Sequence, residues 1–392
     1  MRHNVLFLCS YYPNRLRNGG NFIERHALAV AQFANVSVLT LEPDHLKAAP
    51  FELVYTQEHE GRLTVVRAYY NLNCVNIPIL KSLIRFSRFL KAAWKGYDLL
   101  KQKTGKPQIV HLNVIRPLGI FALLLTYFEK LPFVLTEHST AYLDENKDGM
   151  TFLEKQLTSH VLKAAKTIMP VSLLLKNAII KRFHIADSKF QVVSNVVSSD
   201  IFFQRQQQTF QGKVKFLHVS NMKPFKNVEG IIRIMAQLQQ KRQDFELHII
   251  GNGDALPSIK VLAKSLNLLD SVLFFHPQKT EKEIAQQMRL MDCFILFSHY
   301  ETASMVVMES LCCGLPVIGT RVGVVPEVVE DGKNGILINP ADENALLDAC
   351  LTMMDNITSF KNLENFKNYT TRFSYKTIGQ QYNTIYNNVL SK

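Results

Sequence analysis

The chain has 392 residues, of which 47% are hydrophobic and 20% charged, and its formal net charge is +12. Length and composition indicate a soluble globular protein with two domains, each long enough to bury a core. The six cysteines are scattered and form no Cys-x-x-Cys pair, which argues against structural zinc and a disulfide framework. The longest apolar run, residues 117–128, is too short to cross a bilayer.

Short apolar runs bounded by turn residues predict two series of strands. The first comprises residues 5–9, 36–40, 109–113, 133–136 and 190–193, and the second 214–219, 245–250, 272–275, 293–297, 317–319 and 335–338. The runs alternate with longer helical patterns, which predicts an α/β fold of two Rossmann-like, doubly wound domains with parallel sheets. The first run follows the start without a signal-peptide pattern, so we expect a cytoplasmic protein.

The predicted domain boundary lies in the glutamine-rich stretch 204–212, which is typical of a linker. We therefore expect an amino-terminal domain over residues 1–203 and a carboxy-terminal domain over 204–372. The last segment, 373–392, is predicted to be a helix that crosses back to the first domain.

The positive charge is concentrated in the first half, where residues 1–200 hold 25 Lys and Arg against 15 Asp and Glu. Much of the excess lies between Lys81 and Lys106, and its basic residues recur every three or four positions, as expected for one face of a helix. Such a helix fits an anionic membrane surface, although a helix packed on a sheet with its basic side in water explains the same pattern. No basic motif interleaved with aromatic residues indicates nucleic acid.

Polar or glycine residues follow several predicted strands, at the sheet edge where doubly wound folds bind ligands. They are His138, Asn195, Asn221 with Lys226, Gly251 with Gly253, and Glu301. Each one is ordinary when taken singly, because a histidine there is more often structural and Gly251-Asn-Gly253 lacks the third glycine of the dinucleotide fingerprint. Together they predict a cleft with a lip from each domain.

Two glutamates, Glu301 and Glu309, lie eight residues apart around a helix predicted from about Met305 to Cys313, with Ser304 or Thr302 as its cap. Eight helical residues span about 12 Å, which suits a sugar joined to a nucleoside by a diphosphate better than one sugar ring. The helix N-terminus between them would favour phosphate. The alternative is a surface helix with a solvated glutamate near each end.

The assembled motifs resemble glycosyltransferase family 4, whose members are retaining nucleotide-sugar transferases of the GT-B fold. Glu301 and Glu309 match the E-x7-E signature of that family, and Gly314 and Pro316 match the turn that follows it. The amino-terminal motifs are looser and consist of Gly19-Gly20, Glu24-Arg25-His26, Thr136-Glu137-His138 and Ser194-Asn195. The resemblance covers nearly the whole chain.

The resemblance implies a role for each matching residue. Glu301 would bind donor-sugar hydroxyls, Glu309 would accept hydrogen bonds from the ribose, and Lys226 would neutralise the leaving diphosphate. His138 would lie on the amino-domain side of the reacting sugar. The remaining donor-binding positions would be Asn221, Ala303, Ser304, Met305, Val306, Gly251 and Gly253, with Gly19 and Gly20 close to the diphosphate or the acceptor.

The chain departs from the family at two donor-side positions. The usual Glu-Gly-Phe-Gly is replaced by Glu301-Thr-Ala-Ser304, and the usual Gly-Arg before the lysine by Ser220-Asn221. The second change replaces a phosphate-binding cation by a neutral donor, and charge-assisted hydrogen bonds are roughly twice as strong as neutral ones. The changes affect the donor sugar and nucleotide more than the fold.

The function expected from the resemblance is metal-independent transfer of a sugar from a nucleoside diphosphate donor to a glycan, lipid-linked or small-molecule acceptor, with retained configuration and no cofactor. The sequence contains no Asp-x-Asp site and no clustered histidine ligands. Three alternatives remain open: a non-catalytic nucleotide-sugar-binding partner subunit, a GT-B-type epimerase acting on its own donor, and a peripheral membrane-binding protein.

Overall fold

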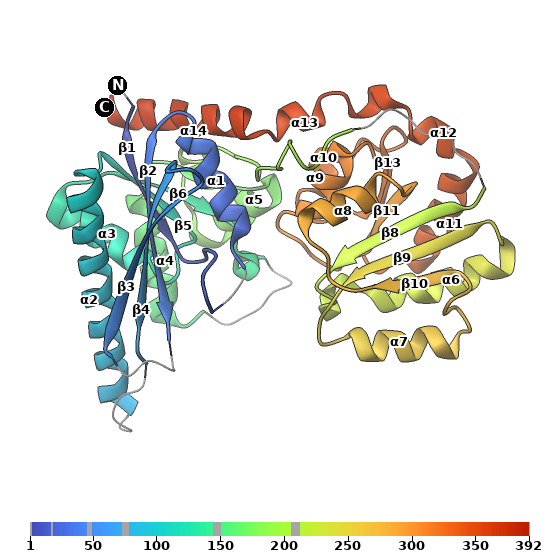
Figure 1. Ribbon diagram of the computed structural model, residues 1–392, viewed down its shortest axis with the longest axis horizontal. Helices are drawn as coiled ribbons and strands as arrows, with labels where there is room; N and C mark the ends of the chain where they lie inside the picture. Colours follow the sequence, from blue (N-terminus) through green and yellow to red (C-terminus); the bar gives the residue numbers. More distant parts are fainter. Residues whose placement is uncertain are drawn as a thin grey trace. The chain divides into compact units, whose positions relative to one another are not determined.

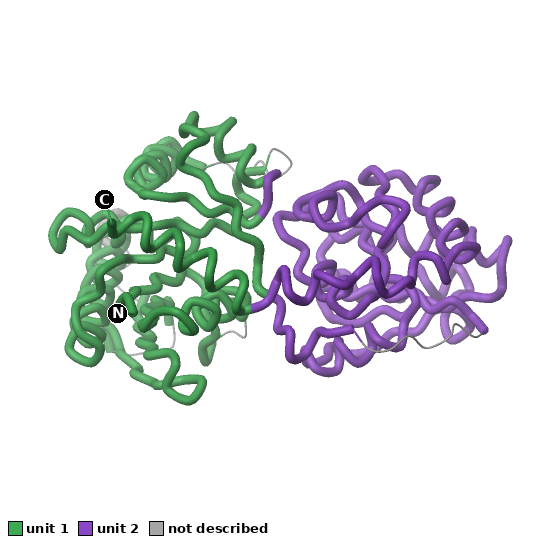
Figure 2. Tube along the Cα trace, turned by 90° about the horizontal axis from the view of Figure 1, so that it is seen from above, with its two compact units in different colours: residues 1–171, 175–196, 375–392 green, residues 172–174, 197–374 purple. Residues whose placement is uncertain are grey.

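A computed structural model describes residues 2–16, 19–44, 49–72, 78–143, 150–204 and 212–391, with the backbone alone for 78–80. The chain forms two compact units (Figure 2). Unit 1 comprises residues 1–171, 175–196 and 375–392, and unit 2 comprises 172–174 and 197–374. The last helix therefore belongs to the unit that the amino-terminal part of the chain forms.

Unit 1 is built on a seven-stranded sheet of order β3-β4-β2-β1-β5-β6-β7, in which β3 is antiparallel to β4 and the other neighbours are parallel (Figure 1). The strands are β1 (Asn4–Cys9), β2 (Asn35–Pro43), β3 (Phe51–Glu58), β4 (Leu63–Tyr70), β5 (Ile109–Asn113), β6 (Phe133–Glu137) and β7 (Ile168–Pro170).

The strand predictions for unit 1 were incomplete. Four of the five predicted strands are confirmed, but residues 190–193 form only a bridge from Phe190 to Ile168. Strands β3, β4 and β7 were not predicted. Edge strand β3 is only half-buried, Arg67 interrupts the apolar run of β4, and β7 has only three residues, so none of them is a long continuous apolar run.

Helices cover both faces of this sheet. One face packs against α1 (Asn21–Ala31) and α14 (Tyr375–Leu390), and the other against α2 (Pro78–Thr104) and α3 (Gly119–Glu129) (Figure 1). Unit 1 also contains η1 (Thr140–Tyr142), α4 (Phe152–Ala164), most of α5 (Leu173–Phe183) and η2 (Asp187–Lys189).

Close packing and a buried polar network hold α14 against unit 1. A Cβ at Gly379 would lie 2.1 Å from the Ala29 carbonyl oxygen of α1, so only glycine permits this approach. The Tyr382 hydroxyl lies 2.8 Å from His26 Nδ1, and the Tyr386 hydroxyl lies 2.6 Å from His111 Nδ1. Burial lowers the pKa of His26 to about 4 and the pKa of His111 well below its usual value, so both rings are neutral at pH 7.

Unit 2 contains a six-stranded parallel sheet of order β10-β9-β8-β11-β12-β13. Its strands are β8 (Val214–Ser220), β9 (Phe245–Gly251), β10 (Leu273–His276), β11 (Cys293–Leu296), β12 (Val317–Thr320) and β13 (Gly335–Ile338). All six predicted strands are confirmed to within a residue at either end. They are easily recognised because both faces of the sheet are covered and most of the strands are continuous apolar runs.

The helices of unit 2 pack on both faces of this sheet. They are η3 (Pro224–Lys226), α6 (Val228–Lys241), α7 (Leu256–Ser265), α8 (Glu281–Met288), α9 (Met305–Cys312), α10 (Val325–Val328), α11 (Glu343–Asp355), α12 (Ile357–Phe360), η4 (Leu363–Phe366) and α13 (Tyr369–Arg372).

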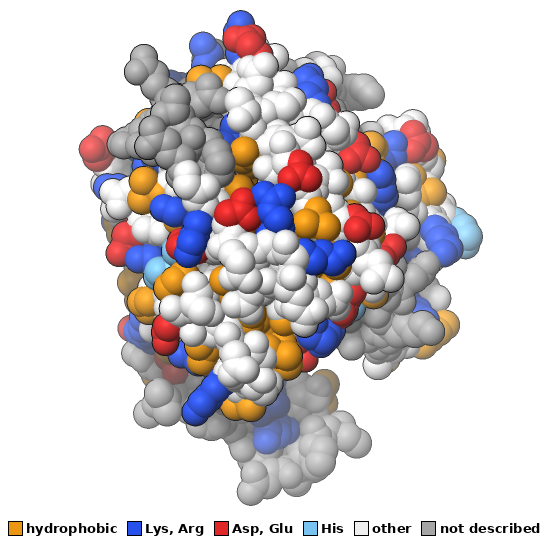
Figure 3. All heavy atoms as spheres, turned by 90° about the vertical axis from the view of Figure 1, so that its right-hand side faces the viewer, with side chains coloured by type: hydrophobic (Ala, Val, Ile, Leu, Met, Phe, Trp, Pro, Cys, Tyr) orange, Lys and Arg blue, Asp and Glu red, His pale blue; other side chains and the backbone are white. Residues whose placement is uncertain are grey.

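On the face of the molecule shown in Figure 3, acidic and basic side chains are interspersed.

The described cysteines are buried free thiols: Cys9, Cys293, Cys312, Cys313 and Cys350. Among the described residues, every helix is too short or too polar to cross a membrane.

Candidate active site

A buried ion pair joins two of the predicted catalytic residues in unit 2. Lys226 lies at the end of η3, Glu301 follows β11, and Lys226 Nζ contacts Glu301 Oε1 directly. Ser298 Oγ donates to the same carboxylate oxygen at 2.9 Å. Removing two charges from water is costly, so such a pair is weak evidence for stability and suits a site that presents charge to a ligand.

The loop that carries Lys226 is fixed to the loop that carries Glu301. The His299 N–H donates to the Phe225 carbonyl at 2.8 Å, and the Phe225 ring stacks on Tyr300 with ring centres 4.7 Å apart. On the other side of Lys226, Asn227 has φ 51° and caps α6 by accepting from the Gly230 N–H at 3.3 Å. The position of Lys226 is therefore set before any ligand binds.

Helix α9 begins with an uncapped N-terminus. Ser304 occupies the cap position as predicted, but its side chain makes no capping hydrogen bond, and Ser304 Oγ is buried with no partner among the described residues. The N–H groups of Met305 and Val306 lie in the first turn, where no intrahelical acceptor is available. An unpaired buried hydroxyl beside free N–H groups is expensive unless a ligand supplies the missing bonds.

The eight residues from Glu301 to Glu309 were predicted to have helical spacing, and this prediction was wrong for residues 301–304. Only Met305–Cys312 is helical, so Glu301 lies in the loop four residues before the helix, and the length of about 12 Å does not apply to the pair. Glu309 is the fifth residue of α9 and is buried at 6% exposure, which excludes the solvated surface glutamate. The end of the helix is confirmed, because Gly314 has φ 75° and Leu315 N–H donates to the Ser310 carbonyl.

Two glycines after β9 allow their loop to approach the backbone after β8 closely. A Cβ at Gly253 would lie 2.0 Å from the Asn221 carbonyl oxygen, and one at Gly251 would lie 1.9 Å from that of Ser220. The structure thus brings Gly251, Gly253 and Asn221 together, and the Asn221 side chain is exposed.

A third close approach, which the sequence analysis missed, surrounds Glu301. Gly323 has φ 54°, and its Cβ would lie 2.8 Å from the Glu301 carbonyl oxygen. Ser298 was also missed, since a serine at the end of a strand is common. The signal for Gly323 was its place just after a predicted strand.

In unit 1, His138 follows β6 and lies against α1. Its ring centre is 4.8 Å from that of Phe22 and 5.4 Å from that of His26. Burial lowers the pKa of His138 well below its usual value, and Nε2 is buried without a hydrogen-bond partner among the described residues. A neutral imidazole with a free nitrogen can bond a hydroxyl group without adding charge.

The buried carboxylate of Glu137 positions the loop of His138. Its Oε1 accepts from the N–H groups of His138 and Ser139, both at 3.0 Å, and its Oε2 accepts from Ile115 N–H and Tyr142 Oη, both at 3.2 Å. Burial raises the pKa of Glu137, and the four donors act in the opposite direction. The sequence offered no sign of this role beyond the neighbourhood of His138.

The two glycines before α1 differ in what the fold requires of them. Gly20 has φ 98°, and a Cβ there would lie 2.7 Å from Tyr12 N, whereas a Cβ at Gly19 would meet no atom of the described residues within 4 Å. Gly20 is therefore explained by packing inside unit 1. Gly19 is exposed, and the predicted approach of a ligand to its backbone stays a prediction.

We expect Gly20→Ala to lower the free energy of unfolding of unit 1 by about 2 kcal/mol, because a left-handed backbone and a steric clash add up. Gly19→Ala is the matched control and should change it by less than about 0.5 kcal/mol. Urea unfolding followed by the fluorescence of Trp94, the only tryptophan of the chain, measures both. Equal destabilisation by the two substitutions would contradict this account.

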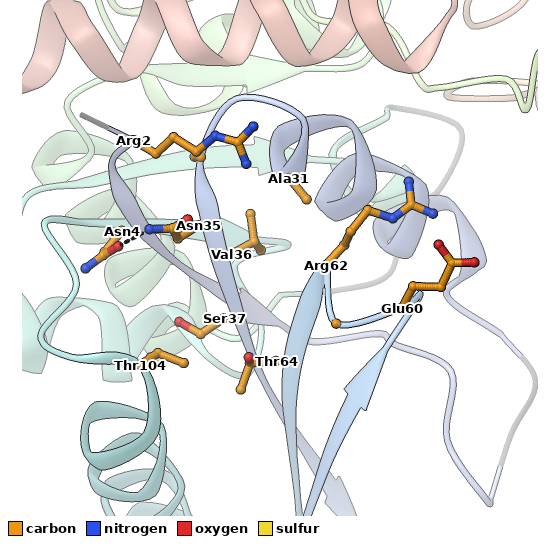
Figure 4. A pocket seen from close by; sticks show the side chains of 12 residues that line it. Arg2, Asn4, Ala31, Asn35, Val36, Ser37, Glu60, Arg62, Thr64 and Thr104 are labelled. Atoms are coloured by element: carbon orange, nitrogen blue, oxygen red, sulfur yellow. Dashed lines mark hydrogen bonds between the residues drawn. The ribbon is translucent and has the colours of Figure 1, made fainter.

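Two other features of unit 1 do not belong to the candidate site. A hollow of about 420 Å³ lies at the amino ends of β1, β2 and β4 and is lined by Arg2, Asn35, Ser37, Arg62 and Thr64, among others (Figure 4). This is the edge of the sheet opposite to the one where doubly wound folds bind ligands.

The second feature is the group formed by Glu24, Glu58 and His59, whose possible metal-ligand atoms lie within 4.8 Å of one another. His59 pairs with Glu24 at 2.9 Å, and Glu58 pairs with Arg67 at 2.6 Å. Both carboxylates of this group therefore already have a side-chain partner.

Comparisons with known proteins agree with this geometry. The family model "Glycosyltransferase Family 4" matches residues 20–200, and "Glycosyl transferases group 1" matches residues 200–373. A similar curated protein is the N-acetyl-alpha-D-glucosaminyl L-malate synthase of Bacillus anthracis, 28% identical over 51% of this chain and 54% of that protein. An uncharacterized glycosyltransferase of Methanocaldococcus jannaschii is 27% identical over 79% of this chain and 82% of its own length.

Solved structures share the fold over the whole chain. Sucrose-phosphate synthase from Thermosynechococcus elongatus superposes with a TM-score of 0.76 and 19% identity, covering 100% of both chains. The Anabaena HepE protein in complex with UDP superposes with a TM-score of 0.75 and 17% identity, covering 99% of this chain and 100% of that one. With its two parallel-sheet units, its Glu301–Glu309 signature and the family models that match residues 20–373, the chain belongs to glycosyltransferase family 4 and has the GT-B fold.

Proposed function

We propose that the protein transfers a sugar from a nucleoside diphosphate donor to a hydroxyl group of an acceptor, with retained anomeric configuration. The observation that carries this proposal is the buried hydroxyl of Ser304 at the uncapped start of α9, which has no partner among the described residues and lies three positions after Glu301, the residue that pairs with Lys226. These groups combine hydroxyl recognition with positive charge for phosphate.

In the proposed reaction, the bond between the anomeric carbon and the diphosphate oxygen breaks, and a bond to the acceptor oxygen forms on the same face. The acceptor proton passes to the leaving phosphate. Lys226 and the N–H groups of Met305 and Val306 stabilise the charge that develops on the diphosphate. Glu301 binds the donor sugar through its hydroxyls and holds Lys226 in place.

The other site residues would bind the rest of the substrates. Glu309 would accept hydrogen bonds from the ribose, and the loops of Asn221, Gly251 and Gly253 would border the nucleotide. In unit 1, the neutral His138 would bond a sugar hydroxyl through Nε2, and Gly19 would allow a close approach of the diphosphate or the acceptor.

We further propose that no metal ion or other cofactor takes part, because a lysine and a helix N-terminus already supply the positive charge that the leaving diphosphate needs. Addition of a chelator should leave the rate of donor cleavage unchanged. A rate that falls with chelator and returns with Mg²⁺ or Mn²⁺ would assign part of this charge to a metal.

The solved structures in complex with UDP and with UDP-glucose make UDP-sugars the first donors to test. The purified chain should release nucleoside diphosphate from at least one member of a panel of UDP-, GDP- and ADP-sugars when simple glycosides and glycolipids are added as acceptors. NMR of the product gives the anomeric configuration. Conversion of a donor in the absence of any acceptor would instead indicate an epimerase, and tight donor binding without turnover would indicate a non-catalytic subunit.

We expect Glu301→Gln to lower kcat about 10²-fold or more, because the amide no longer accepts the Lys226 hydrogen bond as an anion and binds sugar hydroxyls less strongly. The exposed Glu330→Gln is the matched control and should leave the rate unchanged. Initial rates of nucleoside diphosphate release measure both. Unchanged turnover in Glu301→Gln would refute a catalytic role for this carboxylate.

A further inference from the structure

Helix α2 exposes an apolar stripe on the side that faces away from the sheet. Its inner side, with Phe89, Ala93 and Tyr97, is buried in unit 1, and a Cβ at Gly96 would lie 2.6 Å from Leu39 of β2. The outer side is a hollow of about 540 Å³. Its apolar lining comes from Leu83, Phe86, Leu90 and Trp94, and its polar lining from Ser87, Asp98 and two lysines. Leu83 is 62% exposed and Phe86 is 43% exposed.

The stripe continues onto α3. The Trp94 ring lies 6.3 Å from that of Phe128 and 5.2 Å from that of Phe121. Phe128 is 63% exposed and its neighbour Tyr127 is 70% exposed. We name this surface the α2–α3 ridge and define it by Leu83, Phe86, Leu90, Trp94, Tyr127 and Phe128. Large exposed apolar side chains that form one continuous patch mark an interaction site.

Basic side chains border the ridge. Lys91 and Lys95 line the same hollow, and both are exposed. At the end of α3, Lys130 is exposed and its Nζ lies 5.4 Å from the Tyr127 ring centre. Lysine stems can lie along apolar surface while the ammonium groups reach outward. Of the nearby acids, Asp98 lies 3.4 Å from Lys101, and Glu129 pairs with Lys101 and Lys106.

This arrangement corrects the basic face predicted from the sequence. Arg85 and Arg88 do not face open water, because they donate to the backbone carbonyls of Leu72 and Asn71, each at 3.0 Å. They anchor α2 to unit 1, and the exposed positive charge on this side of the helix is left to Lys91 and Lys95. The apolar stripe, and not the row of arginines, therefore forms the contact surface.

We infer that the α2–α3 ridge docks unit 1 on an anionic lipid surface. Apolar side chains such as Phe86, Trp94 and Phe128 would enter the boundary between head groups and acyl chains, while Lys91, Lys95 and Lys130 bind lipid phosphates. A second copy of the chain fits less well, because a two-fold dimer places the same patch against itself and would set these lysines against one another. The inference is independent of the proposed transfer reaction.

Trp94 gives a direct test, since it is the only tryptophan in the chain and lies on the ridge. The full chain is mixed with vesicles of pure phosphatidylcholine or of equimolar phosphatidylcholine and phosphatidylglycerol. With the anionic vesicles we expect co-sedimentation and a blue shift of Trp94 emission, both weakened by salt. With the neutral vesicles both should be much smaller.

Two double variants separate the contributions of charge and apolar surface. Lys91→Glu with Lys95→Glu should weaken binding about 30-fold or more, and Leu83→Ser with Phe86→Ser about tenfold or more. The matched controls lie on α7 of unit 2: Lys260→Glu with Lys264→Glu has the same spacing, and Val261→Ser replaces a side chain that is 69% exposed. The controls should bind as the unaltered chain does, and thermal unfolding checks that every variant folds.

Absence of anionic-vesicle binding, or binding that the two ridge variants leave unchanged, would overturn the inference. Concentration-dependent dimerisation in sedimentation velocity that Leu83→Ser with Phe86→Ser abolishes, without vesicle binding, would assign the ridge to a second copy. Donor cleavage with a water-soluble acceptor is measured separately, so its failure is distinct from failure of membrane docking.

Discussion

Replacing Lys226 by methionine is expected to lower kcat by about 10²–10³-fold. Methionine keeps most of the side-chain volume but removes the ammonium group. The diphosphate would then leave without its positive partner, and Glu301 would be left as a buried carboxylate that keeps its hydrogen bond from Ser298 but has lost its cation. Initial rates of nucleoside diphosphate release give the effect on kcat.

The same substitution should also lower the free energy of unfolding of unit 2 by about 3–5 kcal/mol, because one charge of a buried pair is left uncompensated. Adding Glu301→Gln removes that charge. The double variant should therefore recover stability without recovering activity, which separates a catalytic role from a structural one. Lys241→Met, at the exposed end of α6, is the control. Full activity in Lys226→Met, or recovery of activity in the double variant, would refute the proposed role of the ammonium group.

Acid is expected to destabilise unit 1 well before most carboxylates are protonated. Burial lowers the pKa of His26 from 6.5 to about 4 and the pKa values of His111 and His138 well below their usual range. Between these values the unfolded chain binds protons that the folded chain does not, so stability falls as the pH is lowered from about 6.5 toward about 4. For His26 alone, the pKa shift corresponds to about 3 kcal/mol.

Urea unfolding followed by Trp94 fluorescence at several pH values tests this prediction. His26→Gln should lower the slope of stability against pH by about one proton in this window, even if it also lowers stability at neutral pH. The exposed His160→Gln is the matched control. A slope that is the same in His26→Gln as in the unaltered chain would show that the buried network of α1 and α14 does not titrate as proposed.

The sequence revealed the glutamate pair of the donor site but not its spacing. Glu301 and Glu309 stand out because carboxylates are rare in apolar elements. Their separation could not be worked out, because Glu301 lies in the loop before α9, and the path of that loop depends on how it packs against Gly323. The strongest sign of a ligand is that Ser304 Oγ makes no capping hydrogen bond. The sequence predicted Ser304 as a possible cap and could not reveal that the hydroxyl lacks this bond.

The basic helix illustrates the same limit in unit 1. Its periodicity correctly indicated a helix and placed the basic residues within one sector. Whether an arginine in that sector faces water depends on the nearest backbone carbonyl, and for Arg85 and Arg88 these carbonyls belong to the chain that follows β4. The exposed stripe from Leu83 to Phe128 joins two helices, so it does not exist as a pattern in either helix alone.

Local patterns in the chain were sufficient for the fold class, most of the parallel strands and the family signature, because buried parallel strands and helix ends have short-range sequence requirements. Long-range packing settled the rest. It paired Lys226 with Glu301 across 75 positions, placed α14 against α1 through Gly379, and left His138 neutral among buried rings. Charge state, partner and exposure depend on atoms distant in sequence, so they could be read only from the folded chain.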